Sequence, residues 1–307
     1  MMELRTILAV ILPYAALLVF FLGVSYRVVI WAQVPVPFRI PTTCGQQKSL
    51  PWIKASWLES PYTAAGTVAR VASEVLLFRS LLRNHRLERH GSRLVYSPTL
   101  WLWIAALAFH WSFLVVLVRH LRFFLEPAPK AVLALQALDG FFQVGIPVIY
   151  ASDVILLAAL CFLLARRLAQ AQLRYLSLPA DFAAPALLIA LAGSGILMRY
   201  FTRIDAAEVK RYALGLATFS PILPSGAGPL FYVHIVLLSL LLAWFPFSKL
   251  MHMGGIFLSP TRNLANNSRM KRHVNPWNPS VKLHTYNEWE DEFRDKMKAA
   301  GMPVEKQ

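Results

Sequence analysis

The sequence contains little cysteine and little negative charge. Its two cysteines, Cys44 and Cys161, form no metal-binding or redox motif, so neither a zinc ribbon nor a dithiol site is indicated. Only 16 acidic residues stand against 31 basic ones. The chain also lacks an internal repeat and a glycine-rich phosphate loop, which argues against repeat proteins and nucleotide-binding domains. Apolar residues are abundant instead, at 57% of the chain.

Five apolar stretches are each long enough to cross a ~30 Å hydrocarbon core, which takes about 20 residues. They cover residues 6–31, 98–124, 141–165, 182–200 and 229–250. The first is too long for a cleavable signal peptide and has no small-residue cleavage site behind it, so we expect it to be retained. We therefore predict an all-α membrane protein, a five-transmembrane-helix bundle over residues 1–250. A cytoplasmic loop at 32–97 and a cytoplasmic tail at 251–307 complete it.

Basic residues gather in two polar segments, and this sets the expected orientation. Many lie in the first loop and in the tail, whereas the connections after the second and fourth spans carry few. By the positive-inside rule, the amino terminus is outside and the tail is in the cytoplasm. The net charge of +15 then reflects this uneven placement of basic residues, with a contribution from residues that attract anionic lipid. Nucleic-acid binding is a poor explanation of the positive charge, because no nucleic-acid-binding motif accompanies it.

Two helices are expected outside the membrane. From Val68 to His90, apolar residues recur at helical spacing, which favours an amphipathic helix on the cytoplasmic surface or against a partner. Ordinary solvated packing is the alternative there. The segment EWEDEFRDKMKAA, residues 288–300, is typical of a short charged helix in the tail.

Four histidines lie within or at the ends of two apolar segments. His110 and His120 belong to the second span, and His234 and His252 bracket the fifth. Titratable side chains are rare at membrane depth because each needs a partner there. The two spans run in opposite directions, so His120 faces His234 and His110 faces His252. Two pairs at two depths predict two bis-histidine haem groups, since no carboxylate or thiolate lies close in sequence to complete a zinc site.

The two histidine spacings do not match in length. Ten helical residues rise about 15 Å and eighteen rise about 27 Å. Pro246 lies between His234 and His252 and is expected to kink their helix, which would absorb the difference. For His120 and His252, the alternative is an ordinary interfacial polar residue. The other histidines lie in polar regions and are interpreted as surface residues: His85, His90, His273 and His284.

Other residues fit a haem site less specifically. The small-residue segment 193–195 would let a flat ring or a neighbouring helix approach closely. Asp153, within the third span, is expected to be protonated or paired. Three cations near span ends are candidate partners of haem propionates, with snorkelling to lipid headgroups as the alternative. They are Arg119, Arg122 and Lys249.

Several segments resemble known proteins: PFRIPTTCGQQKSLPWIK, EVLLFRSLLRN, FHWSFLVVLVRHLRFF, FPFSKLMHMGGIFLSPTRN and RHVNPWNP. Together with the histidine spacing, they make most of the chain resemble the cytochrome b (gamma) subunit of respiratory nitrate reductase. Within that superfamily, the chain is most similar to the DsrM family, the membrane cytochromes of the sulfite-reduction-associated DsrMKJOP complex.

The resemblance implies that the four histidines are the axial ligands of two haem b groups in a prokaryotic cytoplasmic membrane. It implies electron exchange with menaquinone or another quinone and with a cytoplasmic, heterodisulfide reductase-like iron–sulfur subunit (DsrK-like), beside DsrJOP-like subunits. Such a redox subunit in dissimilatory sulfur metabolism is not catalytic alone. The family's quinone-pocket lysine is missing, and Asp139 or Gln143 is its candidate substitute. The alternatives are a gamma-type subunit of another respiratory reductase and a non-redox membrane anchor.

Overall fold

The computed structural model describes residues 2–33, 56–141, 147–259, 263–266 and 283–306, and most of them are helical. Two strands, β1 (His85–His90) and β2 (Arg93–Pro98), form an antiparallel hairpin. The helical elements are α1 (Met2–Thr6), η1 (Ile7–Ile11), α2 (Leu12–Gln33), α3 (Ala64–Leu77), α4 (Arg79–Leu82), α5 (Leu100–Phe124), α6 (Lys130–Asp139), α7 (Ala151–Ala169), α8 (Ala171–Leu176), α9 (Pro179–Ile196), η2 (Leu197–Thr202), α10 (Ala206–Ala217), α11 (Pro229–Trp244), η3 (Phe245–Phe247), η4 (Lys249–Met251), α12 (His252–Leu258) and α14 (Tyr286–Ala299).

Four helical segments of the described chain are long and apolar enough to cross a membrane. On α2, the side chains of Leu18, Phe21 and Leu22 are each at least 60% exposed, as lipid-facing residues are. The protein is therefore a multi-pass membrane protein, and four of the five predicted spans lie within a few residues of their expected positions. The four segments are Leu4–Gln33, Leu100–Phe124, Pro179–Thr202 and Pro229–Phe247.

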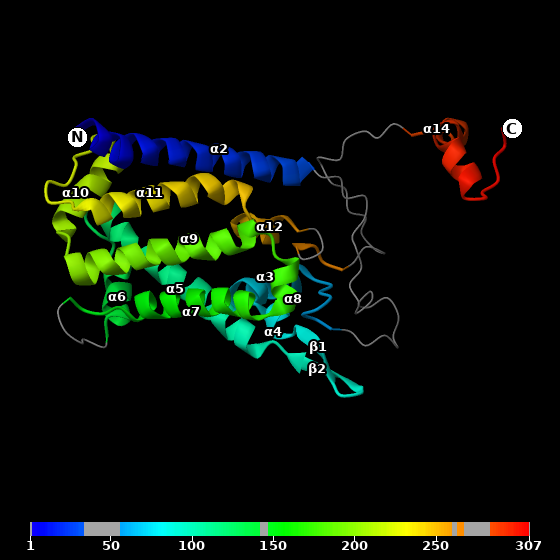
Figure 1. Cartoon of the computed structure of the whole chain (residues 1–307), viewed down its shortest axis with the longest axis horizontal. Helices are drawn as coiled ribbons and strands as arrows, with labels where there is room; N and C mark the ends of the chain where they lie inside the picture. The colour runs from blue at the N-terminus through cyan, green and yellow to red at the C-terminus, as the bar shows by residue number, and fades with distance from the viewer. Residues whose placement is uncertain (1, 34–55, 142–146, 260–262, 267–282, 307) are drawn as a thin grey trace.

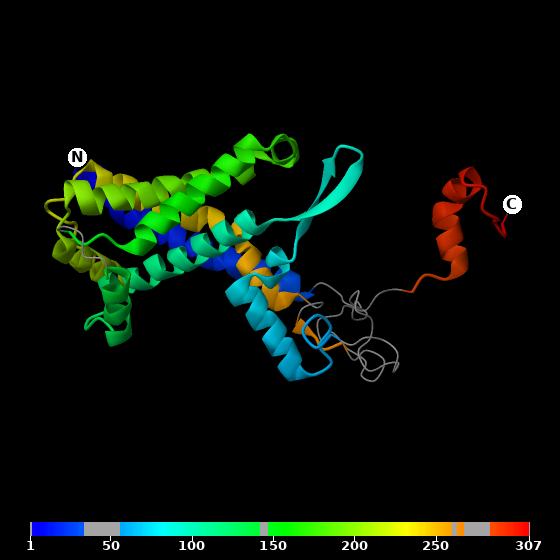
Figure 2. The ribbon, with the colours of Figure 1, turned by 90° about the horizontal axis from the view of Figure 1, so that it is seen from below.

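The third predicted span corresponds to α7, and its predicted start was wrong. The helix begins at Ala151, ten residues later than expected. The Asp139 carboxylate caps this start, because it accepts hydrogen bonds from the backbone N–H (2.8 Å) and the hydroxyl (2.7 Å) of Ser152. Charged residues at both ends, Asp153 and the pair at 166–167, make α7 more polar than the other four segments. It nevertheless packs against both α5 and α9 (Figure 1 and Figure 2).

The long helices lie side by side in one bundle (Figure 1). The helix α2 packs against α11, α11 against α9, α9 against α7, and α7 against α5. One buried apolar cluster joins η1 to α10 and α11. Within it, the Tyr212 hydroxyl donates a hydrogen bond to the Ala9 carbonyl at 2.6 Å. A second cluster joins α7, α9 and α11. Its members are Leu156, Leu160, Leu188 and Leu241.

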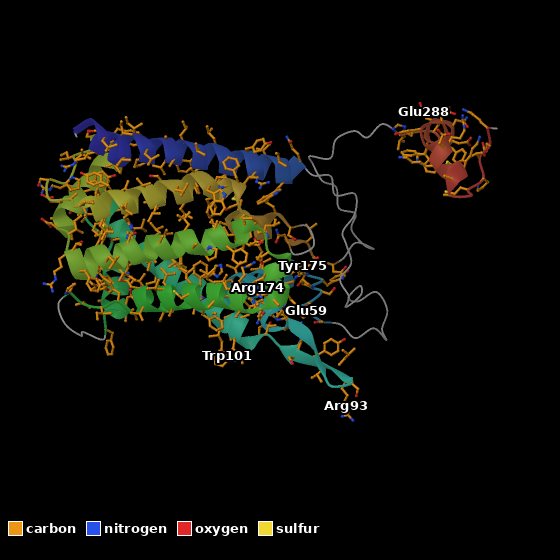
Figure 3. All side chains as sticks on the ribbon, viewed as in Figure 1. Glu59, Arg93, Trp101, Arg174, Tyr175 and Glu288 are labelled. Carbon is orange, nitrogen blue, oxygen red and sulfur yellow. The ribbon has the colours of Figure 1, made fainter. Side chains whose placement is uncertain are left out.

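The loop between the first two spans differs from the single helix predicted over Val68–His90. Helix α3 ends at Phe78, which has a left-handed backbone (φ 49°), and only the short α4 follows. The remainder is the β1–β2 hairpin, which turns at Gly91 (φ 65°) and extends to Arg93 at its tip (Figure 3). A glycine with positive φ between alternating segments favours a hairpin. The helix prediction beyond residue 82 was therefore wrong.

The helix α3 is docked onto the membrane bundle. The indole N–H of Trp103 donates to the Leu77 carbonyl (2.7 Å), and that of Trp111 donates to the Leu76 carbonyl (3.1 Å). These bonds satisfy carbonyls that a helix end leaves without intrahelical partners. They also fix the loop between the first two spans against the amino-terminal half of α5.

Gly23 lies where α2 crosses η3, and it has no room for a side chain. A Cβ added there would lie 2.7 Å from the Cβ of Pro246, which is fully buried. We expect Gly23→Ala to lower the free energy of unfolding by about 1–3 kcal/mol, because one of the two segments must shift. Gly255→Ala is the control, since its added carbon would meet nothing closer than Trp31 at 3.9 Å. Equal unfolding midpoints for the two variants in detergent would contradict this packing.

Glu290 binds the segment that follows the tail helix. The helix α14 agrees with the helix predicted at 288–300, and it starts with a capping box. Glu290 is fully buried, and its carboxylate accepts hydrogen bonds from the backbone N–H groups of Lys306 and Glu305, both at 2.9 Å. These two hydrogen bonds, that from Lys306 foremost, lower the pKa of Glu290 below its ordinary value.

Glu290→Gln is expected to release the segment that follows α14. A carboxyl group whose pKa is lowered by folding stabilises the folded form above its unfolded pKa, and this stability is lost as the pH falls through the folded pKa. Protection of the Glu305 and Lys306 amides from hydrogen exchange, corrected for intrinsic rates, should therefore fall in acid. In the variant it should be low throughout. Glu292 is exposed, so Glu292→Gln should behave as wild type. Identical amide protection in all three proteins would show that Glu290 does not hold the segment after α14.

Candidate functional site

The four predicted ligand histidines come from three helices. His110 and His120 lie on α5, His234 lies on α11, and His252 is the first residue of α12. The helix α11 ends before Pro246, and the short turns η3 and η4 lead on to His252. The expected kink at Pro246 is thus a complete break in the helix. Because of this break, His234 and His252 do not lie on the same face of one continuous helix.

The rings of His110 and His252 lie next to each other. Their centroids are 6.0 Å apart and their planes are at 87°. Nδ1 of His110 is 2.7 Å from the Ala106 carbonyl oxygen, and Nδ1 of His252 is 2.8 Å from the Lys249 carbonyl oxygen. A carbonyl oxygen only accepts hydrogen bonds, so each Nδ1 carries a hydrogen. In a neutral imidazole, each Nε2 then keeps its lone pair.

His120 and His234 remain the second predicted pair, and each has a hydrogen bond of its own at Nδ1. Nδ1 of His120 is 2.7 Å from the Val116 carbonyl oxygen, and Nδ1 of His234 is 2.8 Å from Oγ of Ser194 on α9. Within the described ranges, no hydrogen bond reaches Nε2 of any of the four histidines. The structure therefore brings His110 and His252 together, and in each of the four histidines one ring nitrogen is held and the other is available.

The separation of the His110 and His252 rings is the one that two imidazoles would have if both bound one haem iron. A metal–imidazole bond is about 2 Å long and the ring centroid lies about 1 Å behind the nitrogen, so two ligands of one metal ion have centroids about 6 Å apart. His110 and His252 have this separation, at 6.0 Å. Metal-binding histidines also usually donate their second N–H to a carbonyl or carboxylate. Among the described residues, no three His, Cys, Asp or Glu side chains gather around a common point that could hold a bare metal ion.

All three cations considered for propionates already have protein partners among the described residues. Nζ of Lys249 lies 2.6 Å from the carboxylate of Asp181 on α9. Nη1 of Arg122 donates to Oε1 of Gln136 on α6 at 2.5 Å. Both contacts leave donors on the cations, and both tie the ligand-bearing segments to neighbouring helices.

Arg119, the third cation, is the centre of a buried charged network beside His120. It is 6% exposed, its Nε lies 3.1 Å from the Asp139 carboxylate, and its Nη2 forms an ion pair with Asp153. Tyr200 donates a second hydrogen bond to Asp153, at 2.9 Å. The expectation that Asp153 is protonated or paired is thus confirmed in its paired form. Arg119 balances two carboxylates, which leaves its charge compensated within the protein.

Sequence reasoning missed several members of this region. The Tyr150 ring lies under two guanidinium groups, with Arg119 at 3.7 Å and Arg199 at 4.2 Å from its centroid. The Tyr150 N–H donates to the Tyr200 hydroxyl at 3.0 Å. The only available signal was that these polar groups lie in or beside apolar segments. Gln143, the second candidate quinone residue, lies outside the described residues.

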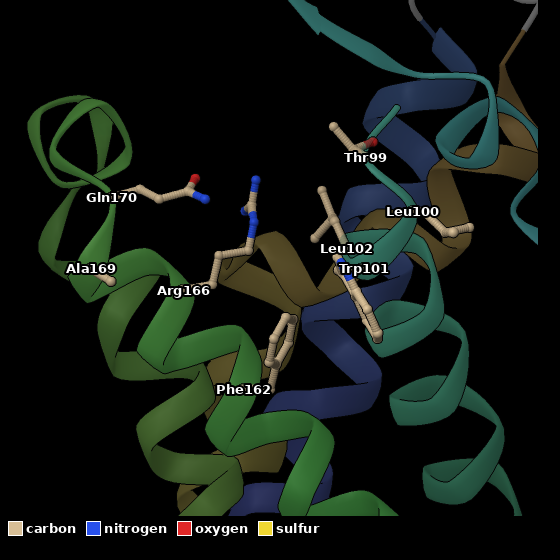
Figure 4. Close-up of a pocket in the computed structure, with 8 residues that line it drawn as sticks. All are labelled: Thr99, Leu100, Trp101, Leu102, Phe162, Arg166, Ala169 and Gln170. Atoms are coloured by element: carbon tan, nitrogen blue, oxygen red, sulfur yellow. The ribbon is translucent and has the colours of Figure 1, made fainter. Parts of the chain in front are cut away.

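A cleft of about 550 Å³ opens between the start of α5 and the end of α7 (Figure 4). Trp101, Leu102 and Phe162 line its apolar part, and Arg166 and Gln170 lie on the α7 side. None of the four histidines lines this cleft, so it is separate from the candidate haem sites.

Comparison with known proteins identifies relatives over nearly the whole chain. The family described as nitrate reductase gamma subunit matches residues 54–273, a range that includes all four histidines. A protein of Archaeoglobus fulgidus described as an Hdr-like menaquinol oxidoreductase cytochrome b-like subunit is 47% identical over 281 residues, which are 89% of this chain and 84% of the relative. An Archaeoglobus profundus protein of the same description is 42% identical over 281 residues, 89% of this chain and 83% of the relative. The chain therefore belongs to the nitrate reductase gamma subunit family.

Proposed function

We propose that this protein is the dihaem cytochrome b subunit of a menaquinol-linked oxidoreductase and carries electrons between the quinone pool and a cytoplasmic partner. The observation that carries the proposal is the arrangement of His110 and His252, whose rings are 6.0 Å apart and whose Nδ1 atoms are held by carbonyls. The description of both relatives as cytochrome b-like subunits of menaquinol oxidoreductases supports the same function.

In this proposal, His110 and His252 ligate one haem b, and His120 and His234 ligate the other. Haem supplies one-electron redox chemistry when bound. The chain's own contribution is to fix each imidazole tautomer and orientation through its Nδ1 partner and to exclude water from the bundle. Two sites at two depths of one bundle provide a path for electrons across the membrane.

We further propose five spans, with α7 as the third, the amino terminus outside, and the loop 32–97 and tail 251–307 in the cytoplasm. The distribution of basic residues supports this orientation. The charge of Asp153 inside α7 is compensated by Arg119, which lowers the cost of placing α7 in the membrane. The membrane would be a prokaryotic cytoplasmic membrane.

The quinone site is proposed at Asp139 and Gln143. The position of Asp139 supports this location, because it pairs with Arg119, the residue before His120 on α5. The missing family lysine would then be replaced by a buried arginine network that positions polar groups near the quinone.

The partner proposed on the cytoplasmic side is an iron–sulfur, heterodisulfide reductase-like (DsrK-like) subunit, with DsrJOP-like subunits, in dissimilatory sulfur metabolism. The segments FPFSKLMHMGGIFLSPTRN and RHVNPWNP support the DsrM-like assignment. The hairpin in the first loop exposes Leu94 (65%) and Tyr96 (73%), and such exposed apolar residues are typical of contact surfaces. Co-purification of that partner, as opposed to another respiratory reductase, would test this assignment.

The experiment that tests the function is a reduced-minus-oxidised spectrum of the purified full chain, with haem measured per polypeptide. We expect a b-type spectrum, two haem groups per chain, and reduction of haem by a menaquinol analogue as well as by dithionite. A preparation that is folded but colourless would refute the proposal. Haem that dithionite reduces but quinol does not would refute the quinone link alone.

A further inference from the structure

His234 differs from the other three histidines in what holds its Nδ1 atom. His110, His120 and His252 each use a backbone carbonyl three or four residues earlier in the chain. His234 uses the hydroxyl of Ser194, which belongs to α9 and lies 40 residues away, at 2.8 Å. Ser194 is only 4% exposed, so no bulk water competes for this contact.

The direction of this hydrogen bond follows from the partners of the serine. Oγ of Ser194 also lies 2.9 Å from the Leu191 carbonyl oxygen, which only accepts, so the single hydroxyl hydrogen is directed there. The serine oxygen therefore accepts from Nδ1–H of His234, and Nε2 of His234 keeps its lone pair.

Gly195, the residue after Ser194, packs against the His234 ring from a second direction. A Cβ added at Gly195 would lie 3.3 Å from Cε1 of His234. The ring thus packs directly on the backbone of α9, beside the serine that binds it. The segment 193–195, which the sequence left open between helix packing and ring packing, places one hydroxyl and one small residue against this single imidazole.

We propose that Ser194 is the positioning residue of His234 and that it sets the redox potential of the His120–His234 haem independently of the other haem. This inference rests on the proposed function, because it requires His234 to be an iron ligand. An acceptor at Nδ1–H makes an imidazole a stronger donor, and outer partners of this kind commonly change metal affinity by 10- to 100-fold. A stronger donor stabilises ferric over ferrous iron. Removing the hydroxyl should therefore raise the midpoint potential of this haem, by about 59 mV for each tenfold change in relative affinity.

The test is a redox titration of haem absorbance in the purified full chain for three variants. Ser194→Ala removes the acceptor, and Ser194→Thr keeps the hydroxyl. Ser239→Ala is the matched control, because Ser239 is equally buried (2%) and its hydroxyl donates to the Ile235 carbonyl within its own helix. We expect Ser194→Ala to retain two haem groups and to shift one midpoint potential upward. The threonine variant and the Ser239 control should titrate as wild type.

Two results would overturn the inference. One is an unchanged pair of potentials in Ser194→Ala with full haem content. The other is an equal shift of both haem groups, or a shift in Ser239→Ala as well, which would indicate a general effect on the bundle. Both results leave the proposed function intact. A wild-type chain without haem would instead refute the function itself, so the two failures are distinguishable.

Discussion

Replacing His110 with alanine is expected to remove one of the two proposed haem groups and to leave the other bound. The variant loses an imidazole whose ring lies 6.0 Å from that of His252. Bound haem should therefore fall by half, and quinol-linked electron transfer to the cytoplasmic side should be lost. His252→Ala should have the same effect. Combining His110→Ala with His234→Ala should leave a colourless protein.

His85→Ala is the matched control for this series. Its Nδ1 lies 2.8 Å from the Arg83 carbonyl oxygen, so it has the same local pattern as the proposed ligands, but it lies on β1 in the loop between the first two spans. It should keep full haem content. Normal haem content in His110→Ala would contradict the pairing of His110 with His252. Loss of both haem groups in this single variant would contradict it as well.

Removal of Arg119 is expected to have the largest effect on stability. The guanidinium forms ion pairs with Asp139 and Asp153, whose side chains are only 6% and 12% exposed. Breaking a buried pair by deleting one partner commonly costs about 3–5 kcal/mol, because it leaves an uncompensated buried charge. Here two carboxylates lose the same cation. Arg119→Lys should recover only part of the loss, since an ammonium group cannot bridge both carboxylates as a planar fork does.

The unfolding midpoint of the purified protein in detergent, measured against denaturant, tests this expectation. Exposed Lys130→Ala removes a positive charge at the start of α6 and should change little. The triple variant Arg119→Ala, Asp139→Asn, Asp153→Asn should regain much of the stability, because no buried charge remains. If Arg119→Ala cost no more than Lys130→Ala, the network would not stabilise the bundle.

The sequence predicted the membrane helices well because long apolar runs leave few alternatives. The spans at α2, α5, α9 and α11 agree with the structure within a few residues. The errors lie where a local signal competed with a tertiary one. The start of α7 is set by a cap from Asp139, twelve residues before it, and the hairpin at Gly91 interrupts a pattern that resembled one amphipathic helix.

The candidate site was predictable only as far as each residue could be judged alone. The four histidines were evident as titratable groups in apolar segments. Arg119 and Asp153 were each recognised as unusual, but their pairing over 34 residues has no sequence signal, and Arg119 was assigned to propionates instead. Ser194 was noted only as a small residue. Its contact with His234 depends on how α9 packs against α11, which spacing within either helix does not reveal.

The most direct test of the central proposal is a low-temperature electron paramagnetic resonance spectrum of the oxidised protein. If His110 and His252 held a haem with their rings at 87° to each other, the oxidised protein should give a strongly anisotropic low-spin ferric signal. That signal should vanish in His252→Ala, while the signal of the second haem remains. A wild-type spectrum without low-spin ferric haem, or one that His252→Ala leaves unchanged, would contradict ligation by these histidines.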